Sequence, residues 1–174
     1  MAPLVAGDAE ELLQLLLRNR RFLAPYEPAR TDAEFTVAGV EGAIREMAAA
    51  RAAGTAYPFC IRAGGELVGR ITLSQVFRKA FQSCYLGYFV GEEHNGRGYA
   101  TEAVRLAVRQ AFDAVGLHRV QANVMTSNPR SARVLEKAGF RREGLALRYL
   151  QIAGRWEDHH MYAITVEDLA GRPN

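Results

Sequence analysis

The stretch from Tyr88 to Met125 most constrains the fold of this chain. An apolar strand pattern ends at Val90, a turn with several glycines follows, and the most clearly amphipathic helix pattern begins at Tyr99. This helix has apolar residues on one face and charged residues on the other, and a second strand pattern occupies residues 118–125. A helix of this length between two strands is typical of a crossover that joins parallel strands. The sequence therefore predicts an α/β fold.

The other segments complete a mixed sheet with flanking helices. Helix patterns show apolar residues at helical spacing, and strand patterns are rich in β-branched and aromatic residues. The expected helices cover residues 8–20, 40–53, 99–115 and 129–138, and the expected strands cover 57–61, 67–76, 83–90, 118–125 and two within 140–165. Asp8 is the expected N-cap of the first helix. We expect a single domain over residues 1–174, with a mostly antiparallel sheet whose first strand is short or missing.

Composition and the rare residue types exclude several classes of protein. With 49% hydrophobic and 24% charged residues, the 174-residue chain has the composition of a folded protein. No apolar run approaches the roughly 20 residues of a membrane helix, and acids rather than basic residues precede the first apolar run. We therefore expect a cytoplasmic protein without a membrane partner. Cys60 and Cys84 are expected to be buried, inert thiols, and the histidine spacing indicates no metal site.

The turn before residue 99 is a candidate anion site. Gly96 and Gly98 let the backbone approach a phosphate closely, and unpaired N–H groups collect at the start of the next helix. Thr101 stands where the dinucleotide fingerprint requires glycine, and no P-loop motif is present. The helix expected at residues 129–138 carries three basic residues on one side: Arg130, Arg133 and Lys137. They form either a solvated face or further contacts to phosphate.

Two motifs together resemble a known family. The segment Asn95-Gly-Arg-Gly98-Tyr-Ala100, followed by Asn128-x-x-Ser131 and Ala-Gly139-Phe140, resembles the acetyl-coenzyme A signature of the GNAT N-acetyltransferase superfamily. Asn95 departs from the family pattern of Gln or Arg at that position. Segments 22–28, 84–91, 117–125, 127–140 and 148–163 narrow the resemblance to the RimJ-like branch, ribosomal-protein alanine N-acetyltransferases. The resemblance implies a GNAT-like fold and extends from about Leu12 to Leu169.

The resemblance also implies which residues hold acetyl-coenzyme A. The backbone of residues 88–90 would face the pantetheine arm, and the amides of residues 96–101 would hold the pyrophosphate. The start of the helix at residues 129–138 would contribute the Asn128 amide and the Ser131 hydroxyl. The implied contacts are Tyr88, Phe89, Val90, Asn95, Gly96, Arg97, Gly98, Tyr99, Ala100, Thr101, Asn128, Ser131 and Arg133. Residues 96–155 carry 11 basic residues against 4 acids, so the local positive charge fits a phosphate-rich cofactor better than a nucleic acid.

The expected catalytic positions depart from the pattern of many relatives. Many relatives use a tyrosine and a glutamate where this chain has Leu135 and Asn123. Ser131 is the candidate general acid, with a contact to coenzyme A or to the first helical turn as the alternative. Water is one candidate base. The carboxylates of Glu27, Glu143, Glu157 and Asp158 are others, with salt-bridged or solvated surface positions as the alternative.

The expected acceptor is an amine. Tyr26, Glu27, Tyr149 and Trp156 are the candidate acceptor contacts, with core packing as the alternative for Trp156. The resemblance implies transfer of acetyl from acetyl-CoA to the N-terminal amine of a protein beginning with Ala or Ser, with a small-subunit ribosomal protein as a candidate. A small-molecule amine, such as a polyamine or aminoglycoside, and a non-catalytic coenzyme A-binding module are the alternatives. We expect a monomer or a homodimer with no direct nucleic-acid partner.

Overall fold

A seven-stranded sheet organises the computed structural model, which describes residues 1–170. The spatial order of the strands is β1-β2-β3-β4-β5-β7-β6. The strands are β1 (Ala2–Pro3), β2 (Tyr57–Ala63), β3 (Glu66–Phe77), β4 (Ser83–Val90), β5 (Arg119–Met125), β6 (Arg141–Ile152) and β7 (Arg155–Thr165). All neighbours pair antiparallel except β4 and β5. The predicted mixed, mostly antiparallel sheet is confirmed, and the first strand is only two residues long.

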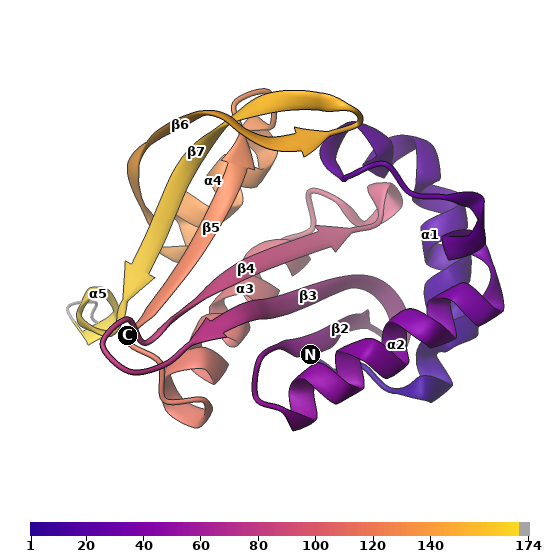
Figure 1. Ribbon diagram of the computed structural model, residues 1–174, viewed down its shortest axis with the longest axis horizontal. Helices are drawn as coiled ribbons and strands as arrows, with labels where there is room; N and C mark the ends of the chain where they lie inside the picture. The colour runs from indigo at the N-terminus through magenta and orange to yellow at the C-terminus, as the bar shows by residue number, and fades with distance from the viewer. Residues whose placement is uncertain (171–174) are drawn as a thin grey trace.

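Helices cover both faces of this sheet (Figure 1). The helices are α1 (Ala9–Leu23), α2 (Val37–Ala52), α3 (Tyr99–Arg109), α4 (Pro129–Ala138) and α5 (Val166–Ala170), and a π-helical turn (Gln110–Ala114) extends α3. On one face, Leu12 and Leu15 of α1 and Ile44 of α2 form a buried cluster that includes Phe89 of β4. The larger cluster, beneath α3 and α4, contains Val104 and Leu135.

The parallel pair β4 and β5 separates along its length. Register pairs run only from Ser83↔Arg119 to Tyr85↔Gln121, and β4 continues to Val90 without a further β5 partner among the described residues. Figure 1 shows the two strands diverging. Gly91 N–H donates to Val68 of β3, so by strand alternation the N–H groups of Tyr88 and Val90 point to the opposite side, toward β5. The gap is therefore lined by backbone groups available to a ligand.

The loop after α1 and the β6–β7 turn meet at one end of this gap. The α1 helix continues as a 3₁₀ turn (Ala24–Tyr26), and Ala153 N–H in the β6–β7 turn donates to the Glu27 carbonyl at 3.3 Å. Figure 1 shows the end of the hairpin beside the end of α1. The strand β6 bulges between Ala146 and Leu150, where its register with β7 shifts. Two segments distant in sequence thus come together near the gap.

The N-terminal end of α1 differs from its prediction. The Asp8 side chain makes no capping bond to α1. Its carboxylate instead accepts from Val5 N–H at 2.8 Å and from Arg62 Nη2 at 2.7 Å, and it lies 3.3 Å from Cys60 Sγ. Burial raises the pKa of the Cys60 and Cys84 thiols to about 12. The predicted burial of both cysteines is confirmed.

Two general features follow from residues 1–170. No helix in this part of the chain is long and apolar enough to cross a membrane. The same residues contain no group of three or more His, Cys, Asp or Glu side chains arranged to hold a metal ion.

Candidate active site

Three adjoining cavities run along the gap between β4 and β5. The first, about 490 Å³, lies at the start of α3 and against α4. The second, about 140 Å³, shares Val90, Asn95 and Ala100 with the first. The third, about 310 Å³, shares Tyr88 and Ser131 with the second. A long ligand can therefore extend from the start of α3 through the sheet to its opposite face.

The first cavity is built for negative charge. Gly96 and Gly98 have φ angles of 78° and 87°, in the left-handed region that favours glycine. Gly98 is the N-cap of α3 and supplies no capping side chain, and a Cβ at either glycine would project into open space. Arg130, Arg133 and Lys137 line the same cavity and form no ion pair within the described residues. A helix N-terminus and unpaired cations together bind phosphate groups.

The middle of the channel contains two coupled hydroxyl groups. Asn128 Oδ1 accepts from Ser131 N–H at 3.1 Å and thereby caps α4. The Ser131 Oγ lies 2.9 Å from the Tyr88 hydroxyl, which also lies 3.2 Å from the Ser131 carbonyl. Burial raises the pKa of Tyr88 to about 12, despite the hydrogen bond with Ser131. The phenol therefore remains protonated at neutral pH and fixes the Ser131 hydroxyl.

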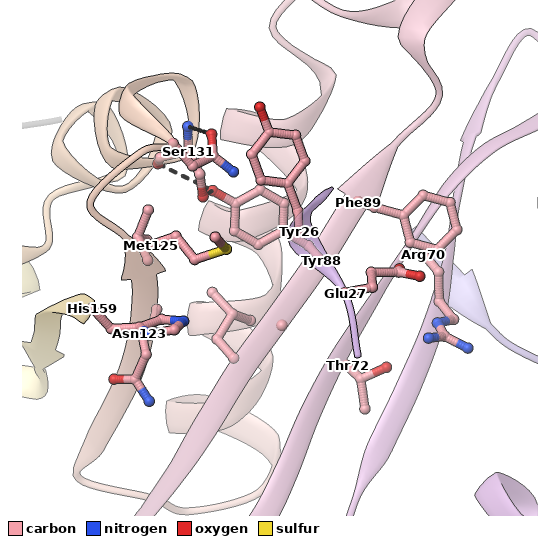
Figure 2. Close-up of a pocket in the computed structure, with 15 residues that line it drawn as sticks. Tyr26, Glu27, Arg70, Thr72, Tyr88, Phe89, Asn123, Met125, Ser131 and His159 are labelled. Carbon is pink, nitrogen blue, oxygen red and sulfur yellow. Dashed lines mark hydrogen bonds between the residues drawn. The ribbon is translucent and has the colours of Figure 1, made fainter. Parts of the chain in front are cut away.

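The third cavity opens on the face of the sheet that α1 and α2 partly cover. Figure 2 shows Asn123 and His159 on one side of it and Arg70 and Thr72 on the other. His159 is 3% exposed, and its ring packs edge-on against Tyr149 with centroids 5.7 Å apart. Asn123 Nδ2 donates to the Tyr149 hydroxyl at 3.2 Å. This cavity holds polar groups of both donor and acceptor character.

Comparison with known proteins decides the family. The sequence model of the acetyltransferase (GNAT) domain family matches residues 1–141. The chain belongs to the GNAT acetyltransferase family. A probable N-acetyltransferase of Bacillus subtilis, YjcK, is 43% identical over 168 residues, covering 95% of this chain and 93% of that protein. The [Ribosomal protein uS5]-alanine N-acetyltransferase of Escherichia coli is 35% identical over 163 residues, covering 92% of this chain and 84% of that protein.

Solved structures agree with this family. Mycobacterium smegmatis RimJ in complex with CoA-disulfide superposes with a TM-score of 0.93 at 35% identity, covering 96% of this chain and 81% of that chain. This protein is therefore an acetyl-CoA-dependent N-acetyltransferase of the GNAT type with RimJ-like relatives. Its first cavity fits the phosphates of coenzyme A, because Gly98 N-caps α3 beside the unpaired Arg130 and Arg133.

Most of the predicted coenzyme A contacts in this GNAT protein line the connected cavities. Those residues are Tyr88, Phe89, Val90, Asn95, Gly96, Gly98, Tyr99, Ala100, Thr101, Asn128, Ser131 and Arg133. Arg97 does not line any of the three. Leu135 is fully buried in the core beneath α4, so its position offers no side chain to the channel.

The candidate acceptor residues separate into two groups. Tyr26 and Glu27 line the third cavity. Tyr149 lies behind its wall, against His159 and Asn123, and Trp156 is 62% exposed outside the three cavities. Among the carboxylates considered as bases, Glu143 pairs with Arg119 and Arg141, and Asp158 accepts from the Arg148 N–H at 2.7 Å.

Sequence reasoning missed several side chains of the third cavity. Arg70 and Thr72 come from β3, Met125 comes from β5, and His159 comes from β7. Strand alternation is the signal that could have identified them, since Arg70 and Thr72 alternate with the buried Ile71 and Leu73. That signal becomes useful only when the order of the strands is known.

Proposed function

We propose that this GNAT enzyme acetylates the N-terminal amine of a protein, with a small-subunit ribosomal protein as the candidate acceptor. The charge of the third cavity carries the proposal. Among residues 1–170, Glu27 is the one acidic side chain that lines this cavity, and its Oε2 accepts from Arg30 Nε at 2.9 Å. The 35% identity with the E. coli uS5-alanine N-acetyltransferase supports the same class of acceptor.

Arg70 argues against a polyamine acceptor. Its guanidinium has no ion pair in the described part of the chain, and its polar contact there is Met47 Sδ at 3.9 Å. Burial lowers the pKa of Arg70, and the nearby positive charge of Arg30 acts in the same direction. A second cation of a polyamine would be repelled by this group. A peptide instead presents one amine followed by carbonyl oxygens, to which Arg70 and Thr72 can donate.

We propose Ala, or the similarly small Ser, as the first residue of the acceptor. The E. coli relative at 35% identity is an alanine N-acetyltransferase. Tyr26 and Glu27, which line the third cavity of about 310 Å³, are the proposed acceptor contacts.

The groups of the channel suit direct transfer. Acetyl-CoA, when bound, supplies an activated acetyl group. The N–H groups of Tyr88 and Val90 face the gap and are candidate donors to the carbonyl oxygen as it gains negative charge. Ser131, fixed by Tyr88, is the proposed acid for the departing sulfur. An α-amine has an ordinary pKa of about 8, against about 10.4 for lysine, so it loses a proton more readily.

The acceptor class can be tested with matched peptides. We would incubate the enzyme with acetyl-CoA and peptides that begin with Ala or Ser, follow thiol release, and locate the acetyl group by mass spectrometry. The same peptides with a blocked N-terminus but an internal lysine are the control. The proposal expects acetylation of the free N-terminus alone. Turnover only on spermidine or an aminoglycoside would contradict it, and tight coenzyme A binding without any turnover would indicate a binding module.

A further inference from the structure

We propose that His159 is the general base that takes the proton from the acceptor amine. His159 lies on β7 directly opposite Met125 of β5, and its side chain lines the third cavity (Figure 2). The next residue, His160, is opposite Val124, whose side chain is in the core beneath α3 and α4. Strand alternation therefore directs His159 to the cavity and His160 to the opposite face.

One hydrogen bond determines the tautomer of His159. Its Nδ1 lies 2.9 Å from the carbonyl oxygen of Glu157. A carbonyl oxygen can only accept, so Nδ1 carries the proton of the neutral ring. Nε2 then has a free lone pair, and it has no hydrogen-bond partner among residues 1–170. An imidazole nitrogen with a free lone pair can take a proton from an amine, which is the role of a general base.

The other side chains of the cavity do not offer an equivalent base. The Glu27 carboxylate is bonded to Arg30, and an ordinary carboxylate is a far weaker base than an amine. The Tyr88 phenol is protonated, since burial raises its pKa to about 12. Asn123 occupies the position where many relatives have a glutamate, and an amide does not accept a proton at neutral pH.

Asn123 supports the base rather than replacing it. Its Nδ2 donates to the Tyr149 hydroxyl at 3.2 Å, and the Tyr149 ring packs edge-on against the His159 ring. Asn123 Oδ1 is itself buried and has no hydrogen-bond partner in the described structure. Tyr149 thus links Asn123 to the histidine, whose Nε2 can accept an N–H from an amine in the cavity.

The proton movements balance in this arrangement. The amine nitrogen bonds to the acetyl carbonyl carbon, its proton passes to His159 Nε2, and the carbon–sulfur bond breaks. The departing sulfur takes a proton from the Ser131 hydroxyl, which regains one from solvent through the pair with Tyr88. The protonated His159 releases its proton to solvent after the product leaves. His159 performs this step for any amine acceptor, whether or not that acceptor is a protein.

A matched pair of variants tests the role. In His159→Asn, the side-chain amide can still donate to the Glu157 carbonyl but lacks a basic nitrogen. We expect kcat/KM for the acceptor to fall about 100-fold, with the affinity for coenzyme A and the melting temperature little changed. His160→Asn, the same substitution one residue later, should retain activity. A His159→Asn variant within about threefold of the unaltered enzyme would overturn the proposal.

Two further readouts separate a base from a structural residue. In both proteins kcat/KM should fall as the pH drops below about 8, because the acceptor amine itself becomes protonated; a second protonation, at His159, should make this fall steeper in the unaltered enzyme than in His159→Asn. The titratable groups that line the cavity beside His159 are Tyr26, Glu27, Arg70 and Tyr88. Tyr149 packs on the His159 ring and interacts with Tyr85, and all of these groups are the same in both proteins. Nitrogen-15 NMR of the enzyme alone should show His159 protonated at Nδ1. A proton on Nε2 instead, or an equally steep fall of kcat/KM in His159→Asn, would contradict the role.

Failure of this proposal differs from failure of the proposed acceptor. If the enzyme acetylates only small amines, His159→Asn still tests the base on those substrates. If peptides are acetylated and His159→Asn is fully active, the proposed protein acceptor stands, and a group other than His159 is the base.

Discussion

The hydroxyl groups of Tyr88 and Ser131 lie 2.9 Å apart where the coenzyme A channel meets the acceptor cavity. Tyr88 comes from the diverging end of β4, and Ser131 comes from the first turn of α4. Because α4 is capped by Asn128, the serine is held from the backbone side as well as from its hydroxyl. This pair connects the parallel crossover to the chemistry of the site.

Removing the Tyr88 hydroxyl should make Ser131 a less effective general acid but should leave the serine in place. In Tyr88→Phe, Ser131 loses one hydrogen bond, which is typically worth about 0.5–1.5 kcal/mol. We expect kcat to fall about 3- to 10-fold, with KM for acetyl-CoA unchanged, as measured by steady-state kinetics. Ser131→Ala should cost more, and adding Tyr88→Phe to it should have little further effect. Unchanged turnover of Ser131→Ala at saturating acetyl-CoA would exclude the acid role.

The glycine at the N-cap of α3 should be required for coenzyme A binding. Gly98 has a φ of 87°, and a side chain in the left-handed region costs about 1–2 kcal/mol. Gly98→Ala should therefore lower the free energy of unfolding and weaken coenzyme A binding, as measured by denaturation and calorimetric titration. Gly42→Ala, within α2, is the matched control and should be neutral or slightly stabilising. Equal affinity in Gly98→Ala would mean that the turn does not contact the phosphates.

The parts of the fold that could be predicted from the sequence are those formed by residues close together in the chain. The turn at residues 96–98 and the amphipathic pattern of α3 identify the crossover without reference to other segments. Asn128 before Pro129 likewise predicts the start of α4. Glycine conformations and helix periodicity depend on neighbouring residues, so these features follow from short segments.

The acceptor side could not be predicted because it depends on the order of strands. Arg70 and His159 reach one cavity only because β3, β4, β5 and β7 are successive neighbours in the sheet. The same limit applies to Asp8, which the sequence predicts as the N-cap of α1 and which makes no capping bond there. Its carboxylate is instead bonded to Arg62, a residue 54 positions away, and a local pattern cannot reveal that competition.

The Asp8–Arg62 ion pair predicts a pH-dependent contribution to stability. Burial would raise the pKa of Asp8, but the bonds from Val5 N–H and Arg62 outweigh burial and hold it below its ordinary value of 3.8. Folding therefore favours the charged carboxylate. Its stabilisation is present above about pH 4 and is lost as the pH falls through the lower folded pKa.

A carboxylate-to-amide change measures this contribution. Asp8→Asn should lower the free energy of unfolding by about 1–3 kcal/mol at pH 7, and the difference should diminish in acid, as measured by urea denaturation at several pH values. Asp32→Asn is the control, because its pair with Arg20 is exposed and worth little. A difference for Asp8→Asn that persists at pH 2 would indicate a loss of packing rather than of charge.

Reversing the charge at Arg70 should change which amines the enzyme accepts. In Arg70→Glu the cavity loses its unpaired cation and gains a second carboxylate beside Glu27. Carboxylates attract a polyamine, while the peptide carbonyls lose a donor. We expect kcat/KM for an Ala-initiated peptide to fall at least tenfold and that for spermidine to rise. Arg45→Glu, an exposed change on α2, controls for net charge. An unchanged ratio of the two activities, with the melting temperature preserved, would show that Arg70 does not select the acceptor.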